Sequence, residues 1–77
     1  KDGTIFWNGN KVGRQVVLHT SIEGKSGVFR AGAFAAQNAS VTYVFMYDKE
    51  MDASLEDTIT TAIQSISIQN IPISIEH

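Results

Sequence analysis

The stretch that decides the fold is Val41-Thr42-Tyr43-Val44-Phe45-Met46-Tyr47. Residues of the β-branched and aromatic types at this density are typical of a β-strand. Alternate positions along a strand point to opposite faces of its sheet, and here both faces are largely apolar. A strand that is apolar on both faces is expected in the middle of a sheet that is covered on both sides.

The segment before this stretch predicts three further strands, over residues 4–7, 14–22 and 28–37. The turns between them are predicted at Asn8-Gly9, at residues 23–27 and at residues 37–40. Asn-Gly tolerates the positive φ angles of a tight hairpin, and paired glycines with polar neighbours are a strong turn signal. Connections of hairpin length indicate an antiparallel meander.

Two of these strands carry further information. Residues 14–22 alternate between a more apolar face and a face formed by Gln15, Val17, His19 and Ser21, so we expect the first of these faces to point inward. That face consists of Val16, Leu18, Thr20 and Ile22. The strand over residues 28–37 is rich in alanine, which leaves room for a bulky element, most simply a helix, to pack across it.

The segment after the central stretch changes to a helical period. Apolar residues recur with helical spacing and form one stripe, which consists of Leu55, Ile59, Ala62, Ile63 and Ile66. Asp52 or Ser54 is expected to cap the start of this helix, and Ser54 with Asp57 has the capping-box spacing. Residues 71–76 then alternate as a terminal strand, and Pro72 places that strand at an edge because proline cannot donate to a ladder.

These elements predict an α+β fold. It is an antiparallel β-meander of about four strands, with one C-terminal α-helix packed on it and a short terminal edge strand. Residues 1–77 form either a single small α+β domain or the C-terminal part of a larger domain. The chain does not begin with methionine, so we expect a processed product or an excised piece.

The composition excludes several classes of function. The 77 residues contain no cysteine, which excludes disulfides, cysteine-based zinc sites and thiol catalysis. The formal net charge of −2, without basic clusters, argues against binding to nucleic acid. No run of residues is long and apolar enough to span a bilayer, so membrane attachment is expected only through an upstream anchor.

One string of residues and the two histidines suggest a chemical site, but the surrounding sequence does not support one. Gly24-Lys25-Ser26 looks like the end of a phosphate-binding loop, but His19 stands where the loop needs its first glycine, and a strand follows instead of a helix. The histidines are His19 and His77, and His19 is interpreted as a surface or partly buried strand residue. We therefore predict no catalytic, cofactor-binding or metal-binding residue.

Two other groups of residues are also interpreted without catalysis. The acidic residues between Asp48 and Asp57 lack the central glycine of a calcium loop, so they are interpreted as a solvated loop with helix capping. Asn38-Ala39-Ser40 fits the N-glycosylation acceptor pattern. The aromatic residues are interpreted mainly as core, and five of them are candidates for an interface, namely Phe29, Phe34, Tyr43, Phe45 and Tyr47.

Residues 11–68 resemble the C-terminal half of the PsbP-like (PsbP/LpqN) superfamily. The likeness is carried by Asn10-Lys11-Val12-Gly13-Arg14 leading into a strand, by the strand at residues 41–47 followed by an acidic loop, and by Ile63-Gln64-Ser65-Ile66 at the end of the helix. The resemblance implies an antiparallel sheet with helices on both faces. It also implies a mostly non-catalytic, exported or membrane-attached protein that assists or binds partners.

Two functions remain after this reasoning. The first is a non-enzymatic extracytoplasmic interaction or assembly domain, secreted, lipid-anchored or membrane-attached, that completes its core by dimerisation or with a partner segment. The second is a structural or regulatory fragment of a larger enzyme whose catalytic residues lie outside this chain. A ligand-binding role also stays open, because the alanine-rich strand could form the floor of a pocket.

Overall fold

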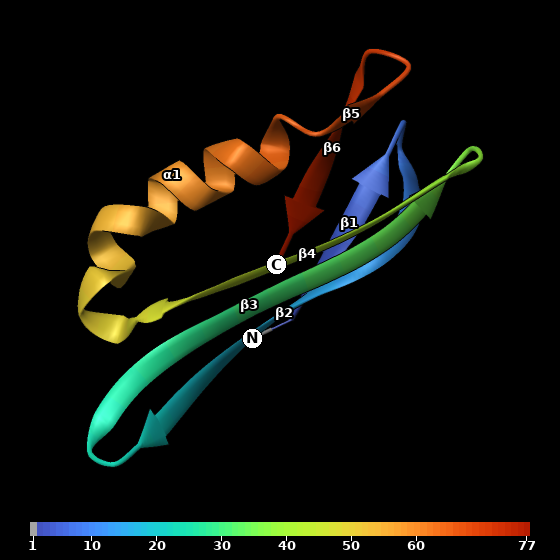
Figure 1. Cartoon of the computed structure of the whole chain (residues 1–77). Coiled ribbons are helices and arrows are strands. Elements are labelled where there is room, and N and C mark those ends of the chain that lie inside the picture. Colours follow the sequence, from blue (N-terminus) through green and yellow to red (C-terminus); the bar gives the residue numbers. More distant parts are fainter. Residues whose placement is uncertain (1) are drawn as a thin grey trace.

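Figure 1 shows the computed structural model of the chain, which describes residues 2–77. Six strands form one sheet in the order β4-β3-β2-β1-β6-β5, and every pairing between neighbours is antiparallel. The fold is therefore α+β, a mostly antiparallel sheet with one α-helix, as predicted. The elements are β1 (Asp2–Trp7), β2 (Asn10–Ile22), β3 (Lys25–Ala36), β4 (Ala39–Asp48), the 3-10 helix η1 (Lys49–Met51), α1 (Asp52–Gln64), β5 (Ser67–Ile68) and β6 (Ile71–Glu76).

Tight turns of two residues join the first four strands. Asn8 and Gly9 connect β1 to β2 with φ angles of 51° and 78°, which confirms the predicted hairpin. Glu23 and Gly24 connect β2 to β3 with φ angles of 53° and 78°. Positive φ at both central positions matches the twist of a hairpin. The predicted turns at residues 23–27 and 37–40 were too long, because β3 and β4 already begin at Lys25 and Ala39.

The sheet has more strands than the sequence analysis predicted. The predicted meander is present as β1 to β4, but β5 and β6 extend it, so the estimate of about four strands was wrong. The predicted edge position of the terminal strand was also wrong, because β6 lies between β1 and β5. Pro72 is tolerated there because β6 pairs with β1 only from Ile73 onward, so its missing N–H falls outside that ladder.

The position of β4 also differs from the prediction. We expected residues 41–47 in the middle of a sheet covered on both sides, but β4 is at one edge of the sheet. One face of β4 packs against the core through Val41, Tyr43, Phe45 and Tyr47. Val44 and Met46, on the other face, are 53% and 74% exposed. The apolar character of this second face therefore does not arise from burial inside the chain.

The inward face of β2 was predicted the wrong way round. Gln15 is 1% exposed, whereas Leu18 and Ile22 are 50% and 71% exposed. The register explains this reversal, because it places Gln15 opposite Gly32 and Gly13 opposite Phe34 on β3. Phe34 is in the core, so its neighbours on β2 must share its face. The orientation of β2 is thus set by the stronger apolar face of its neighbours.

The helix begins without the predicted side-chain cap. Met51 occupies the N-cap position with no side-chain hydrogen bond, and the hydroxyl of Ser54 donates to the carbonyl of Met51 at 3.0 Å. The turn of η1 immediately before α1 leaves neither Asp52 nor Ser54 at the N-cap position. From the predicted stripe, Ile59 and Ile63 are buried, while Leu55 and Ile66 pack against the core and Ala62 is exposed.

The core joins the first and last strands to the helix. It contains the buried residues Ile5, Trp7, Phe34, Ala36, Ile59, Ile63 and Ile73. The molecule is elongated, with principal extents of 43 × 19 × 18 Å and a radius of gyration of 13.4 Å. A compact chain of this length would have a radius of gyration of about 11.5 Å. The hairpin of β2 and β3 causes much of this elongation, because its tip projects beyond the other strands (Figure 1).

Candidate functional site

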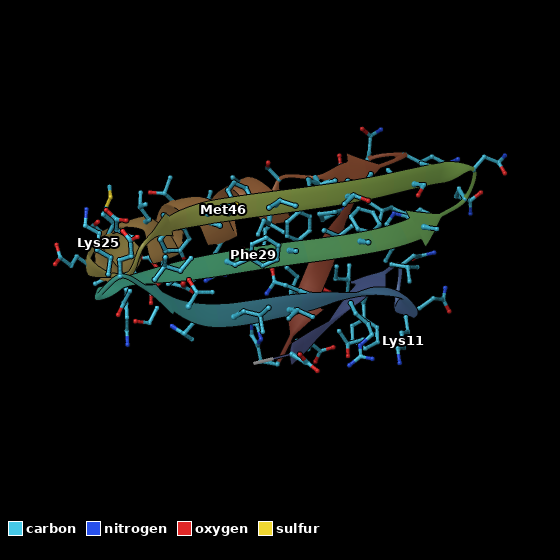
Figure 2. All side chains as sticks on the ribbon, turned by 60° about the horizontal axis from the view of Figure 1, so that its bottom comes forward. Lys11, Lys25, Phe29 and Met46 are labelled. Atoms are coloured by element: carbon cyan, nitrogen blue, oxygen red, sulfur yellow. The ribbon has the colours of Figure 1, made fainter. Side chains whose placement is uncertain are left out.

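The sheet presents an outer face that points away from α1. Residue pairing across β2, β3 and β4 places Leu18, Phe29 and Met46 in one row, and Val16, Ala31 and Val44 in the next. Figure 2 views this side, with Phe29 and Met46 on neighbouring strands and Lys11 and Lys25 toward opposite ends of the sheet. We use the name outer face for the set Arg14, Val16, Leu18, Thr20, Ile22, Lys25, Gly27, Phe29, Ala31, Ala33, Ala35, Ser40, Thr42, Val44, Met46 and Asp48.

The middle of the outer face exposes large apolar side chains. Its ionisable members lie toward its two ends: Arg14 is in the row of Ala33, and Lys25 and Asp48 are near the tip of the β2–β3 hairpin. Leu18, Val44, Ile22 and Met46 are 50%, 53%, 71% and 74% exposed. Isolated exposed apolar residues are normal on a protein surface, but a contiguous apolar patch marks an interaction site. These residues are contiguous across three paired strands, which makes the outer face the strongest candidate site among residues 2–77.

The outer face is hollowed toward the tip of the β2–β3 hairpin. A shallow groove of about 580 Å³ is lined there by Leu18, Ile22, Phe29 and Met46, together with Thr20, Gly27, Val28, Tyr47 and Asp48. Further along β3 the outward residues are Ala31, Ala33 and Ala35, which are small. Val16 and Val44 flank Ala31, and Arg14 and Thr42 flank Ala33, so the alanines form a shallow path along β3.

The opposite face carries a buried arginine that links the sheet to the helix. Arg30 on β3 is 5% exposed, and its guanidinium donates to the carboxylate of Glu56 on α1 and, at 3.5 Å, to the hydroxyl of Tyr47. The Tyr47 hydroxyl in turn donates to Asp52 at 2.8 Å. Burial disfavours the charge on Arg30, but the hydrogen bonds to Tyr47 and Glu56 outweigh it, so the pKa of Arg30 is raised. This chain of contacts holds the start of α1 against β3 and β4.

A second polar contact lies deeper on the same face. Tyr43 donates its hydroxyl proton to the amide oxygen of Gln15 at 2.7 Å. The tyrosine ring lies over Gly32, where an added Cβ would be 2.3 Å from the ring. The missing side chain at Gly32 thus makes room for Tyr43, and Tyr43 provides a partner for the buried Gln15. Burial raises the pKa of Tyr43 to about 12, although the charge of Arg30 acts in the opposite direction.

This raised pKa predicts a loss of stability in alkaline solution. Tyrosine titrates near pH 10 when unfolded, so the unfolded state loses its proton first as pH rises from about 10 to 12. Stability is fully present below pH 10 and decreases through that range. Tyr43→Phe is expected to be less stable than wild type near pH 8 by about 1–3 kcal/mol, because Gln15 loses its partner. Urea unfolding from pH 8 to 12 should show that the difference in free energy of unfolding between wild type and Tyr43→Phe becomes smaller. A difference that stays constant over this range would contradict the raised pKa of Tyr43.

The two histidines lie near this polar cluster. His19, Arg30, Asp52, Glu56 and His77 line a small hollow of about 290 Å³, together with Val17. Within this hollow Arg30 pairs with Glu56, and Asp52 accepts a hydrogen bond from Tyr47. Within residues 2–77, no group of three or more histidine, cysteine, aspartate or glutamate side chains is arranged to hold a metal ion. His19 itself is exposed on β2.

The Gly24-Lys25-Ser26 string lies at the tip of the β2–β3 hairpin. Gly24 belongs to the turn, and Lys25 and Ser26 begin β3, so a strand follows this string as the sequence predicted. A hollow at this tip is lined by the three residues of the string and by Asp48, Lys49 and Glu50. The lining carries two positive and two negative charges, so the hollow offers a phosphate group no net attraction.

The five predicted interface aromatics do not share one surface. Phe34 is in the core, and Tyr43, Phe45 and Tyr47 pack against it on the inner face. Only Phe29 among them belongs to the outer face. Sequence reasoning did not select Leu18, Ile22, Val44 or Met46 as interface residues. The signal that could have identified them is the turn length, since short turns fix which residues of neighbouring strands share a face.

Comparisons with protein families, with curated proteins and with solved structures found no match to this chain. The resemblance of residues 11–68 to the PsbP-like superfamily therefore stays a prediction. None of the helices in residues 2–77 is both long and apolar enough to cross a membrane.

Proposed function

We propose that this chain is a non-enzymatic interaction or assembly domain that acts outside the cytoplasm and binds a protein partner through its outer face. The observation that carries the proposal is the contiguous apolar middle of the outer face, with Leu18 50% and Met46 74% exposed. Removing apolar surface from water contributes about 25 cal/mol per Å², so a partner that covers these side chains gains binding energy from each of them.

The shape of the outer face favours an amphipathic helix as the partner element. The small residues Ala31, Ala33 and Ala35 run along β3, and Val16 and Val44 on the neighbouring strands flank Ala31. Strands β2 and β4 are two strand spacings apart, about 10 Å. An α-helix with its side chains has a diameter of about 10–12 Å, so one helix laid over β3 would cover the width from β2 to β4. The chain's own helix lies on the opposite face and leaves this path free.

The polar residues of the inner face are assigned a structural role in this proposal. Arg30, Glu56, Tyr47 and Asp52 direct their hydrogen bonds toward one another. They also join the sheet to α1, which keeps the fold rigid behind the binding face. A rigid scaffold behind an apolar surface lowers the entropy cost of binding.

A photo-crosslinking experiment tests the proposal. A benzophenone amino acid at Leu18 would probe the outer face, and the same residue at Ser21, which is exposed on β2 with the opposite orientation, is the matched control. The labelled protein is exposed to a membrane and envelope extract of the source organism, and products are identified by mass spectrometry. We expect a discrete partner from position 18 and none from position 21.

The identified partner is then purified and its affinity measured. Leu18→Lys is expected to weaken binding at least tenfold, and Ser21→Lys is expected to change it less than twofold. Equal crosslinking from both positions, or equal effects of the two lysine substitutions, would overturn the proposal. The partner crosslinked at position 18 could instead prove to be a catalytic domain of the same polypeptide. That result would replace the proposed function with the alternative one, a structural or regulatory part of a larger enzyme.

A further inference from the structure

The strand β4 leaves a long edge of the sheet without a neighbour. Within residues 2–77, β4 is hydrogen-bonded to β3 alone. It runs for ten residues, Ala39–Asp48, and its register with β3 continues without a bulge from Gly27↔Asp48 to Ala36↔Ala39. In an edge strand, alternate residues direct their N–H and C=O groups away from the sheet. This edge therefore offers an unbroken row of hydrogen-bonding groups.

The two edges of the sheet are protected very differently. The opposite edge is β5, which has only two residues and lies against the segment of β6 that contains Pro72. Short strands and prolines are the usual means of preventing edge-to-edge association. Strand β4 has no proline and no lysine, and Asp48 at its end is its only charged residue. The sequence thus blocks association at one edge and permits it at the other.

We propose that β4 pairs with β4 of a second copy of this chain, antiparallel, about a two-fold axis perpendicular to the sheet at Val44. In this register Val44 lies opposite Val44 of the second copy, and Thr42 lies opposite its Met46. Tyr43 lies opposite Phe45 on the inner side. Aromatic and β-branched pairs of this kind stabilise neighbouring strands, and no charges of like sign meet. A two-fold pairing also closes on itself and does not propagate into a fibre.

This pairing extends the proposed function without depending on it. A perpendicular two-fold axis keeps both outer faces on the same side of the joined sheet. The dimer then presents a doubled apolar surface to a partner. The two proposals separate experimentally, because Leu18 lies on β2 away from the β4 edge, whereas Val44 lies at the dimer axis.

Sedimentation equilibrium of the purified chain tests the pairing. Wild type is expected to dimerise with rising concentration. Val44→Lys brings two like charges together at the axis and should raise the dimer dissociation constant at least tenfold. Val44→Glu should do the same, and an equimolar mixture of the two variants should restore a 1:1 dimer. Leu18→Lys, at a position of similar exposure, should leave dimerisation within threefold of wild type.

A covalent probe makes the register testable even if the lysine variants are less stable. The chain has no cysteine, so Val44→Cys introduces a single thiol. Residues directly opposite in antiparallel strands have Cα atoms about 4.5–5.5 Å apart, which suits a disulfide. Mild oxidation should link Val44→Cys into dimers much faster than Leu18→Cys. A monomeric wild type at millimolar concentration, equal linkage of the two cysteine variants, or loss of dimer in Leu18→Lys would each overturn the proposal.

Discussion

Replacing Gly13 by alanine is expected to remove most of the stability of this fold. A Cβ at Gly13 would lie 2.0 Å from the carbonyl oxygen of Ala33 and 2.6 Å from the Cα of Phe34. Both neighbours are backbone atoms, so no change of side-chain rotamer can relieve the overlap. Strands β2 and β3 would have to separate at the position where Phe34 enters the core.

The expected cost is about 3 kcal/mol, at the upper end of what overpacking usually causes. Small domains are stable by only about 5 kcal/mol. For a domain of this size, a loss of 3 kcal/mol lowers the melting temperature by about 12–24 °C. Circular dichroism during heating and urea unfolding would measure the loss.

Gly27→Ala is the matched control for Gly13→Ala. A Cβ at Gly27 would lie 3.1 Å from the Thr20 hydroxyl and 3.7 Å from the Tyr47 carbonyl oxygen. Thr20 is exposed and its side chain can shift, so we expect a change of less than about 1 kcal/mol. If both variants unfold within about 0.5 kcal/mol of wild type, a rough limit for substitutions without a specific mechanism, the close approach of β2 and β3 at Gly13 is wrong.

The local features of this fold were readable from the sequence. Asn8-Gly9 and Glu23-Gly24 provide residues that tolerate positive φ, and both form tight turns. The apolar spacing of Ile59 and Ile63 predicted the helix, and both side chains are buried. These signals act over a few residues, so a single sequence is enough to show them.

The orientation of β2 required information from other strands. The alternation of apolar residues within β2 predicted that Leu18 points inward. However, all strands of a sheet bury the same face, so the neighbouring strands also determine which side of β2 is buried. The turn at Glu23-Gly24 sets Ile22 opposite Lys25, and thereby Leu18 opposite Phe29. The aromatic side of β4 then decides which face is buried. The outer face, which is the candidate site, is exposed because the sheet as a whole buries its other face. No sequence motif indicates it.

The six-stranded sheet was beyond sequence reasoning because its last pairing is remote in the chain. Strand β6 pairs with β1 through Ile5↔Ile75 and Trp7↔Ile73. Nothing local in residues 71–76 indicates β1 as the partner. Trp7 supports this pairing by a second contact, since its indole N–H is shared between the carbonyl oxygens of Ile68 at 3.2 Å and Ile71 at 3.1 Å.

Trp7→Ala is therefore expected to unfold the chain or leave it without fixed packing. Trp7 is 6% exposed in the core, and truncating a buried tryptophan costs about 3–5 kcal/mol, close to the whole stability of a small domain. Trp7→Phe keeps an aromatic ring but removes the N–H, leaving the two carbonyls without their donor at a cost of about 1–3 kcal/mol. Urea unfolding should rank wild type above Trp7→Phe, and Trp7→Phe above Trp7→Ala.

The residues that lose protection from amide hydrogen exchange show whether Trp7 stabilises the fold through its hydrogen bonds or through its volume. The carbonyls that accept from the indole lie on either side of the turn between β5 and β6, so Trp7→Phe should speed amide exchange selectively in residues 67–73. Phe34→Leu removes part of another core ring that has no polar atom, so it should lower protection across the sheet without that selectivity. Uniform loss of protection in both variants would mean that Trp7 acts only by filling space. Selective loss in Trp7→Phe would show that one indole N–H ties the β5–β6 hairpin to β1.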